Sequence, residues 1–213
     1  MHKELQKRIL SSIVIIPVSF FFILKGSLPF IFFLTALLIL TSYEWIRMNT
    51  KIIIKVTGIL FLFYSFTSAY LLRENFGSYL FITVIVICIC TDIGGYTFGK
   101  LFKGPKLTNI SPNKTYSGMF GSFLIPMLFF LILNKYYDRL NSFITIFSND
   151  YHLDLLFIFL FSALSQAGDL FISYFKRLAK VKNTGNFLPG HGGILDRIDG
   201  IIFVIPISYL IFN

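Results

Sequence analysis

The sequence predicts an all-α, polytopic integral membrane protein with about seven transmembrane helices and cytoplasmic polar loops. Hydrophobic residues make up 55% of the 213 residues, charged residues make up 14%, and the mean hydropathy is +0.76. The apolar residues gather in runs of about the length that crosses a bilayer as a helix. The basic residues are distributed unevenly between the two ends of these runs. Together these observations exclude a soluble globular domain.

Seven apolar runs are visible along the chain. They cover residues 9–24, 27–43, 52–72, 76–91, 119–134, 153–172 and 200–213. Several runs are at the short end of what spans a bilayer, so a re-entrant or merged pair stays open. Lys25 and Gly26 alone separate the first two runs, which predicts a tight turn. Without a repeat or a linker, we expect one transmembrane domain over residues 1–213.

Charge selects one orientation of these spans. If the N-terminus is cytoplasmic, only four of the 19 basic residues lie outside, namely Lys25, Arg73, Lys135 and Arg139. This asymmetry obeys the positive-inside rule, whereas the inverse orientation violates it. The net charge of +9 is therefore mostly topology, and we expect no nucleic-acid partner.

Two smaller features lie within the apolar runs. Cys88 and Cys90 predict buried free thiols, with neither a disulfide nor a metal site. At the end of the second run, aromatic and charged residues lie together, which is typical of an anchor at the membrane interface, with a catalytic role for Glu44 as the alternative. This cluster consists of Tyr43, Glu44, Trp45 and Arg47.

A dense polar block, residues 173–200, interrupts the apolar sequence. Its lysines and arginines can donate hydrogen bonds to phosphate oxygens, and its glycines let backbone N–H groups approach an anion. Asp196 and Asp199 would share one face if they open a helix, and carboxylates beside phosphates suit Mg²⁺. The block predicts a metal-assisted phosphate site at a membrane surface. A basic loop that binds anionic lipid headgroups would explain the cations, but not the PGHGG stretch or the two acids.

Three other segments carry polar residues toward the same side of the membrane. Asp92 lies at the cytoplasmic end of the fourth run, where an ionisable group indicates function, although capping a helix or pairing with Lys100 is an alternative. Asp169 has the equivalent place in the sixth run. The loop 100–118 contains the sequence SPNKT, whose residue types bind phosphates or a sugar.

The stretch 173–199 resembles the signature of the phosphatidate cytidylyltransferases, also called CDP-diacylglycerol synthases. The matching positions are Ser173, Lys176, Arg177, Lys182, Gly185, Pro189, Gly190, His191, Gly192, Gly193, Asp196, Arg197 and Asp199. The segments 92–96, 111–115 and 168–170 also look like parts of this family. The resemblance covers roughly residues 88–213, which would form the catalytic half.

The resemblance implies an enzyme that converts phosphatidate and CTP to CDP-diacylglycerol and pyrophosphate for phospholipid synthesis. It implies a bacterial inner membrane, membrane lipids as partners, a cytoplasmic active site, and Mg²⁺ or another hard divalent cation on Asp169 and Asp196. The implied catalytic residues are these two and Lys176, Arg177, Lys182, His191, Arg197 and Asp199. The implied substrate-binding residues are Asp92, Ser111, Asn113, Lys114, Thr115, Ser173, Gly192 and Gly193.

The chain departs from the family pattern at three positions. Asn183, Ile172 and Ser117 stand where the family usually has a carboxylate. These neutral residues leave open a CTP-dependent enzyme for another lipid phosphate, or a degenerate lipid-binding homologue without activity. A homodimer and an assisting monovalent cation are also left open by the sequence.

Overall fold

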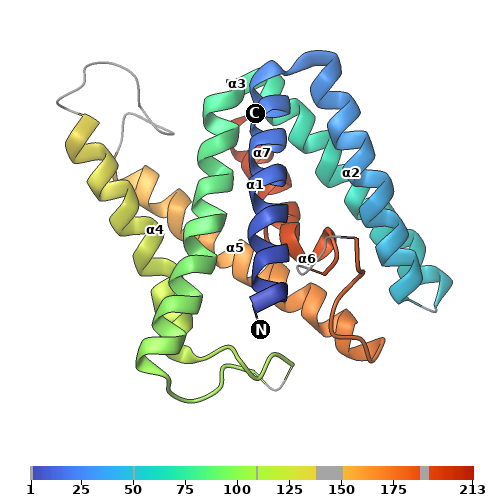
Figure 1. Cartoon of the computed structure of the whole chain (residues 1–213). Helices are drawn as coiled ribbons and strands as arrows, with labels where there is room; N and C mark the ends of the chain where they lie inside the picture. Colours follow the sequence, from blue (N-terminus) through green and yellow to red (C-terminus); the bar gives the residue numbers. More distant parts are fainter. Residues whose placement is uncertain (1, 50, 109, 138–150, 188–191) are drawn as a thin grey trace.

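The computed structural model describes residues 2–49, 51–108, 110–137, 151–187 and 192–213, and these residues form helices and loops without a strand. The all-α prediction is therefore confirmed for this part of the chain (Figure 1). The helices are α1 (His2–Lys25), α2 (Ser27–Met48), α3 (Ile52–Phe102), α4 (Tyr116–Tyr137), α5 (Tyr151–Leu178), α6 (Leu195–Ile198) and α7 (Ile201–Phe212).

Helix α3 is two antiparallel arms rather than one rod. A straight helix of its 51 residues would be about 77 Å long, far more than a bilayer core of ~30 Å. At Gly77 the backbone has φ 86° and ψ 163°, and the chain reverses there (Figure 1). Only glycine adopts this conformation without strain. The arms 52–76 and 78–102 thus correspond to the third and fourth apolar runs.

Length and composition suit a membrane. Within the described residues, four helical segments are long and apolar enough to span a bilayer: Ser27–Met48, Ile52–Phe102, Tyr116–Leu133 and His152–Leu178. Shorter apolar helical segments cover Ile13–Lys25 and Ile201–Phe212. The chain is accordingly an integral membrane protein. The predicted tight turn is confirmed, because Gly26, with φ 63°, is the one residue between α1 and α2.

Helices α3 and α5 continue well past the C-terminal limits of the apolar runs that predicted them. The fourth run stops at residue 91, whereas α3 continues to Phe102; the sixth stops at residue 172, whereas α5 continues to Leu178. Hydropathy reports contact with lipid, but a helix persists wherever its backbone hydrogen bonds are satisfied. These extensions carry Asp92, Tyr96 and Lys176, which line the site described below.

Glycines bring the second arm of α3 against α4. A Cβ atom on Gly94 would collide with the carbonyl oxygen of Gly121, and one on Gly95 would lie 2.6 Å from the Ser122 hydroxyl. The two backbones can approach this closely only because no side chain separates them. Helix α7 packs beside α3, where the Ser65 hydroxyl donates to the carbonyl of Ile202 at 2.8 Å.

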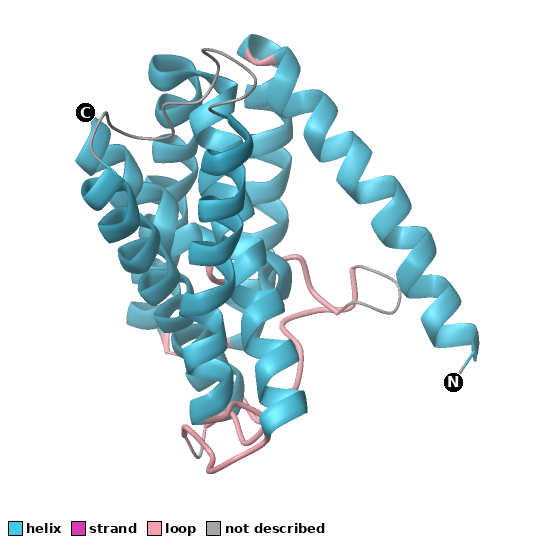
Figure 2. Cartoon of the chain, turned by 90° about the vertical axis from the view of Figure 1, so that its left-hand side faces the viewer, coloured by secondary structure: helices cyan, strands magenta, loops and turns pink. Residues whose placement is uncertain are grey.

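The two ends of the bundle differ in character. The loop 103–115, the C-terminal end of α5 and the N-terminal end of α1 lie at one end, whereas the connection between α1 and α2 and the reversal of α3 lie at the other (Figure 1). Helix α1 leans away from the other helices toward its N-terminal end (Figure 2). We call these two ends the loop end and the turn end.

The prediction of an interfacial anchor in α2 is wrong for two of its four residues. Tyr43 and Arg47 are exposed, but Glu44 and Trp45 are only 2% and 4% exposed. The Trp45 indole donates to the carbonyl of Ile54 at 3.0 Å, and Glu44 points into the protein. The sequence pattern missed this burial because it does not show which residues of α2 face other helices. The prediction of buried free thiols is confirmed, since Cys88 and Cys90 are both buried.

Candidate active site

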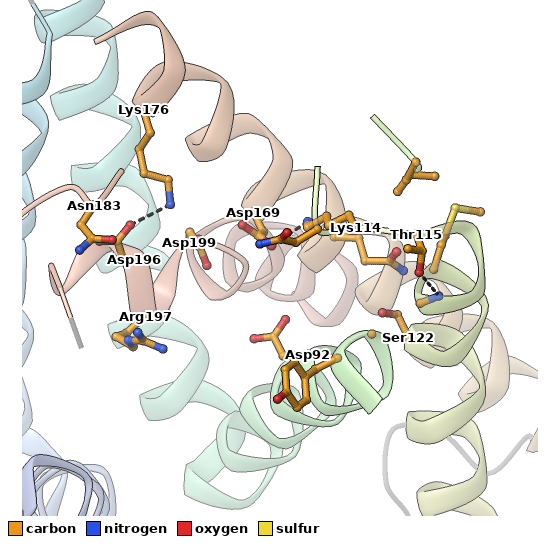
Figure 3. Close-up of a pocket in the computed structure, with 17 residues that line it drawn as sticks. Asp92, Lys114, Thr115, Ser122, Asp169, Lys176, Asn183, Asp196, Arg197 and Asp199 are labelled. Carbon is orange, nitrogen blue, oxygen red and sulfur yellow. Dashed lines mark hydrogen bonds and ion pairs between the residues drawn. The ribbon is translucent and has the colours of Figure 1, made fainter. Parts of the chain in front are cut away.

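A cavity of about 410 Å³ lies at the loop end, where α3, α4, α5, α6 and the loop 103–115 meet (Figure 3). It brings together residues from the polar block 173–200, the loop 100–118 and the segments that contain Asp92 and Asp169. The predicted site residues that line it are Asp92, Asn113, Lys114, Thr115, Asp169, Lys176, Asp196, Arg197 and Asp199.

The first charged pair in the cavity joins the SPNKT loop to α5. The Lys114 ammonium group lies 2.6 Å from the Asp169 carboxylate, and Ser173 donates to the same carboxylate at 3.2 Å. Ser173 is one turn beyond Asp169 on α5, which is the spacing at which helical side chains meet. Both side chains of the pair are partly exposed to the cavity.

The second pair joins the end of α5 to α6. The Lys176 ammonium group lies 2.8 Å from Asp196 Oδ1, and these side chains are only 11% and 9% exposed. The backbone N–H groups of Thr184 and Gly193 donate to Asp196 Oδ2 at 2.8 and 3.0 Å. A buried carboxylate is stable when such donors replace water, so the short helix α6 is held by its own first-turn acid.

Two further acids face the same space. The Asp199 carboxyl group is hydrogen-bonded to Asp169, while Asp92 approaches from α3 (Figure 3). Burial, reinforced by the neighbouring Asp169 charge, raises the pKa of Asp199 well above its ordinary value. Carboxylates crowded in this way repel one another, and a cation between them would relieve the repulsion.

The carboxylates of the cavity determine whether it can hold a metal ion. The described residues contain no group of three or more His, Cys, Asp or Glu side chains placed to enclose a metal. Mg²⁺ does not require one, because it commonly takes one or two protein carboxylates and completes its shell with water and substrate phosphates. The acids of this cavity fit that mode of binding.

Several predicted site residues lie outside the cavity wall. Arg177 donates to the carbonyl of Ile110 at 3.2 Å, Lys182 is exposed, and Ser111 takes part in the turn of its own loop. Ser173, Gly192 and Gly193 stand behind the wall, next to Asp169 or Asp196. The prediction for His191 falls outside the described residues.

Other residues of the wall were missed by sequence reasoning. Gln166 and Ser122 line the cavity, and the buried Gln166 amide nitrogen has no hydrogen-bond partner in the described structure. Gln166 lies three residues before Asp169 on α5, so helical spacing from that acid was the signal that could have found it.

The three departures from the family pattern have different surroundings. Asn183 lines the cavity, whereas Ile172 is 2% exposed within the apolar core. Ser117 hydrogen-bonds to Thr115 and to the carbonyl of Lys103. Only Asn183 therefore changes the charge of the cavity wall directly.

Comparisons with known proteins show to which family the chain belongs. Residues 50–213 match the model of the cytidylyltransferase family, a match that begins well before residue 88. The chain is 35% identical over 189 residues to a phosphatidate cytidylyltransferase of Staphylococcus epidermidis, covering 86% of this chain and 67% of the relative. It is 34% identical over 218 residues to one of Rickettsia bellii, covering 98% and 90%. The chain belongs to the cytidylyltransferase family.

Proposed function

We propose that the protein transfers a cytidylyl group from CTP to phosphatidate, giving CDP-diacylglycerol and pyrophosphate for phospholipid synthesis. The observation that carries this proposal is the cavity in which two lysine–aspartate pairs and two further acids converge, in a chain of this family. Cations that bind phosphates and carboxylates that bind a divalent metal are the two groups that the reaction requires.

The reaction brings two anions together. A phosphate oxygen of phosphatidate forms a bond to the α-phosphorus of CTP, and the bond from that phosphorus to the bridging oxygen of pyrophosphate breaks. Lys114 and Lys176 reduce the repulsion between the anions. Each bonds to a cavity carboxylate, and an ammonium group has three donors, so both can also donate to phosphate. No general base is needed, because the attacking phosphate is already ionised.

A divalent ion, Mg²⁺ in this proposal, would be held by Asp169 and Asp196. When bound, it would supply Lewis-acid stabilisation of charge on the phosphates. Asp199 is hydrogen-bonded to Asp169 and orients this carboxylate. Arg197 and Asn113, which also line the cavity, orient the nucleotide phosphates and the sugar.

The apolar helices and the uneven distribution of basic residues support a proposed membrane arrangement. Counting the two arms of α3 separately, we propose seven crossings, with the N-terminus and the loop end in the cytoplasm, where CTP is found. The protein then lies in a bacterial inner membrane. Phosphatidate enters the cavity sideways from the bilayer, since its acyl chains cannot leave the apolar region.

Turnover by purified, detergent-solubilised protein tests the proposal. Phosphatidate and α-labelled CTP are supplied with and without Mg²⁺, for the wild type, Asp169→Asn and Asp154→Asn. Asp154 is a matched control, because it is a buried carboxylate in the first turn of the same helix, at the other end from Asp169. We expect Mg²⁺-dependent CDP-diacylglycerol from the wild type and the control, and a loss of at least ~100-fold in Asp169→Asn.

Product formed equally well by Asp169→Asn would contradict the assignment of this carboxylate. Folded wild-type protein without turnover would contradict the proposal that the protein is a cytidylyltransferase for phosphatidate. In that case a panel of other lipid phosphates with CTP separates a different substrate from a non-catalytic homologue.

A further inference from the structure

Glu44 is a buried acid that does not line the cavity. It lies in α2, is 2% exposed, and precedes the residues matched by the family model. A buried carboxylate is costly unless donors satisfy it. Three donors do so, all from a segment at least 140 residues later in the chain. The Thr184 hydroxyl and the Leu195 N–H donate to Oε2, and the Ile194 N–H donates to Oε1, each at 2.9 Å.

These donors lie on both sides of the PGHGG stretch. Thr184 precedes it, whereas Ile194 and Leu195 follow it, so one carboxylate joins the two ends of this loop. The approach depends on glycine. A Cβ atom on Gly185 would lie 2.6 Å from Glu44 Oε1, and one on Gly193 would lie 2.5 Å from Oε2. Any side chain at either position would push the loop away from α2.

The same segment carries the predicted metal ligand Asp196. Thr184 connects the two acids, because its hydroxyl bonds to Glu44 while its N–H bonds to Asp196 at 2.8 Å. Helix α6 has only four residues and lacks a side-chain cap of its own. The N–H groups of Ile194 and Leu195 are the unsatisfied donors expected at a helix start, and Glu44 satisfies them from another helix.

We propose that Glu44 is a positioning residue for cytidylyl transfer. It does not touch the substrates; it fixes the loop and α6 so that Asp196 and Arg197 keep their places in the cavity wall. This inference rests on the proposed function of the cavity.

The substitution Glu44→Gln tests this role with little change in shape. A glutamine amide has one acceptor oxygen and one NH₂ group, so it cannot accept at both positions. We expect kcat/KM for CTP to fall ~10- to 100-fold, the range for hydrogen bonds to a charged group. The Mg²⁺ concentration for half-maximal activity should also rise. Trp45→Phe is the matched control, because it removes a hydrogen bond from the adjacent buried residue to α3. It should leave both quantities within about twofold.

A double-mutant cycle separates positioning from general packing. Because Glu44 and Thr184 act through one hydrogen bond, the effects of Glu44→Gln and Thr184→Val on kcat/KM should be strongly non-additive. The effects of Trp45→Phe and Thr184→Val should add. Additive effects in the first cycle, or a Glu44→Gln enzyme with wild-type kcat/KM and Mg²⁺ dependence, would overturn the proposal.

Hydrogen–deuterium exchange provides a readout without turnover. The N–H groups of Thr184, Gly193, Ile194 and Leu195 should exchange faster in Glu44→Gln than in the wild type, and Trp45→Phe should leave them unchanged. Unchanged exchange in Glu44→Gln would refute positioning even if the enzyme is active. Inactive wild-type protein with the expected exchange pattern would refute only the proposed function.

Discussion

The turn end and the loop end both contain buried or half-buried charges, but they use them differently. At the turn end, Arg73 donates to the carbonyls of Ile23 and Leu24 at 3.0 and 3.1 Å and to Glu74 at 2.7 Å. Glu74 in turn accepts from the N–H of Ser27 at 3.0 Å. These charges connect α3 to the end of α1 and the start of α2, and their main partners are backbone groups of helix termini.

At the loop end, charged side chains face one another across a hollow. Lys114 and Lys176 each reach an acid from a different segment, and Asp92 and Asp199 share the same space. A guanidinium that bonds to carbonyl oxygens has little capacity for a ligand. An ammonium group beside an open cavity retains N–H donors that can bind a ligand. The comparison teaches that the partners of a charge, rather than its burial, distinguish a connecting group from a candidate catalytic one.

The largest effect on this comparison is expected from Lys176→Met. Removal of the ammonium group leaves Asp196 with two backbone donors and no countercharge in a place that is 9% exposed. We expect kcat/KM to fall by ~100-fold or more. The free energy of unfolding should fall by about 3–5 kcal/mol, as when a buried pair loses one partner. Enzyme assays and thermal unfolding in detergent measure the two effects.

Lys180→Met is the control for this substitution. Lys180 is exposed and lies four residues further along the chain, so both quantities should stay close to those of the wild type. Equal activities of the two variants would mean that Lys176 has no special role in the cavity.

The counterpart at the turn end is Arg73→Met. Two bonds to the last carbonyls of α1 are lost, and we expect a loss of about 1–3 kcal/mol in the free energy of unfolding. The kcat/KM should stay within about twofold of the wild-type value, since a substitution at a distant site usually has little effect on the active site. Lys25→Met removes a charge at the same end and serves as control. An activity loss as large as that of Lys176→Met would show that the two ends are coupled.

The sequence predicted much of this architecture, but not its contacts. The apolar runs predicted the helices, and the glycines at 26 and 77 lie where the chain turns. The apolar runs stop short of the helix ends at Phe102 and Leu178, because hydropathy marks only the apolar part of a helix.

The site was predicted unevenly for a related reason. The spacing of Asp196 and Asp199 indicated a shared face, and both line the cavity. The pairing of Lys114 with Asp169 could not be read from spacing, because the two residues come from separate segments. Glu44 was expected at the membrane interface. Its partners include backbone N–H groups 150 residues away, and no residue-type pattern records such partners.

The smallest expected effect concerns Asp199 and is a gain of stability. Its raised pKa means that the folded protein holds the Asp199 proton more tightly than the unfolded chain does. Ionisation of Asp199 therefore costs folding free energy once the pH exceeds the ordinary aspartate pKa of about 4, and the cost grows until the pH passes the raised value.

The substitution Asp199→Asn removes this cost. Without divalent metal, the variant should match the wild type near pH 4 and melt at a higher temperature near pH 7.5. A melting temperature lowered equally at both pH values would contradict the idea that crowded carboxylates destabilise the metal-free cavity. Added Mg²⁺ should narrow the difference, because a bound cation offsets the same repulsion in the wild type.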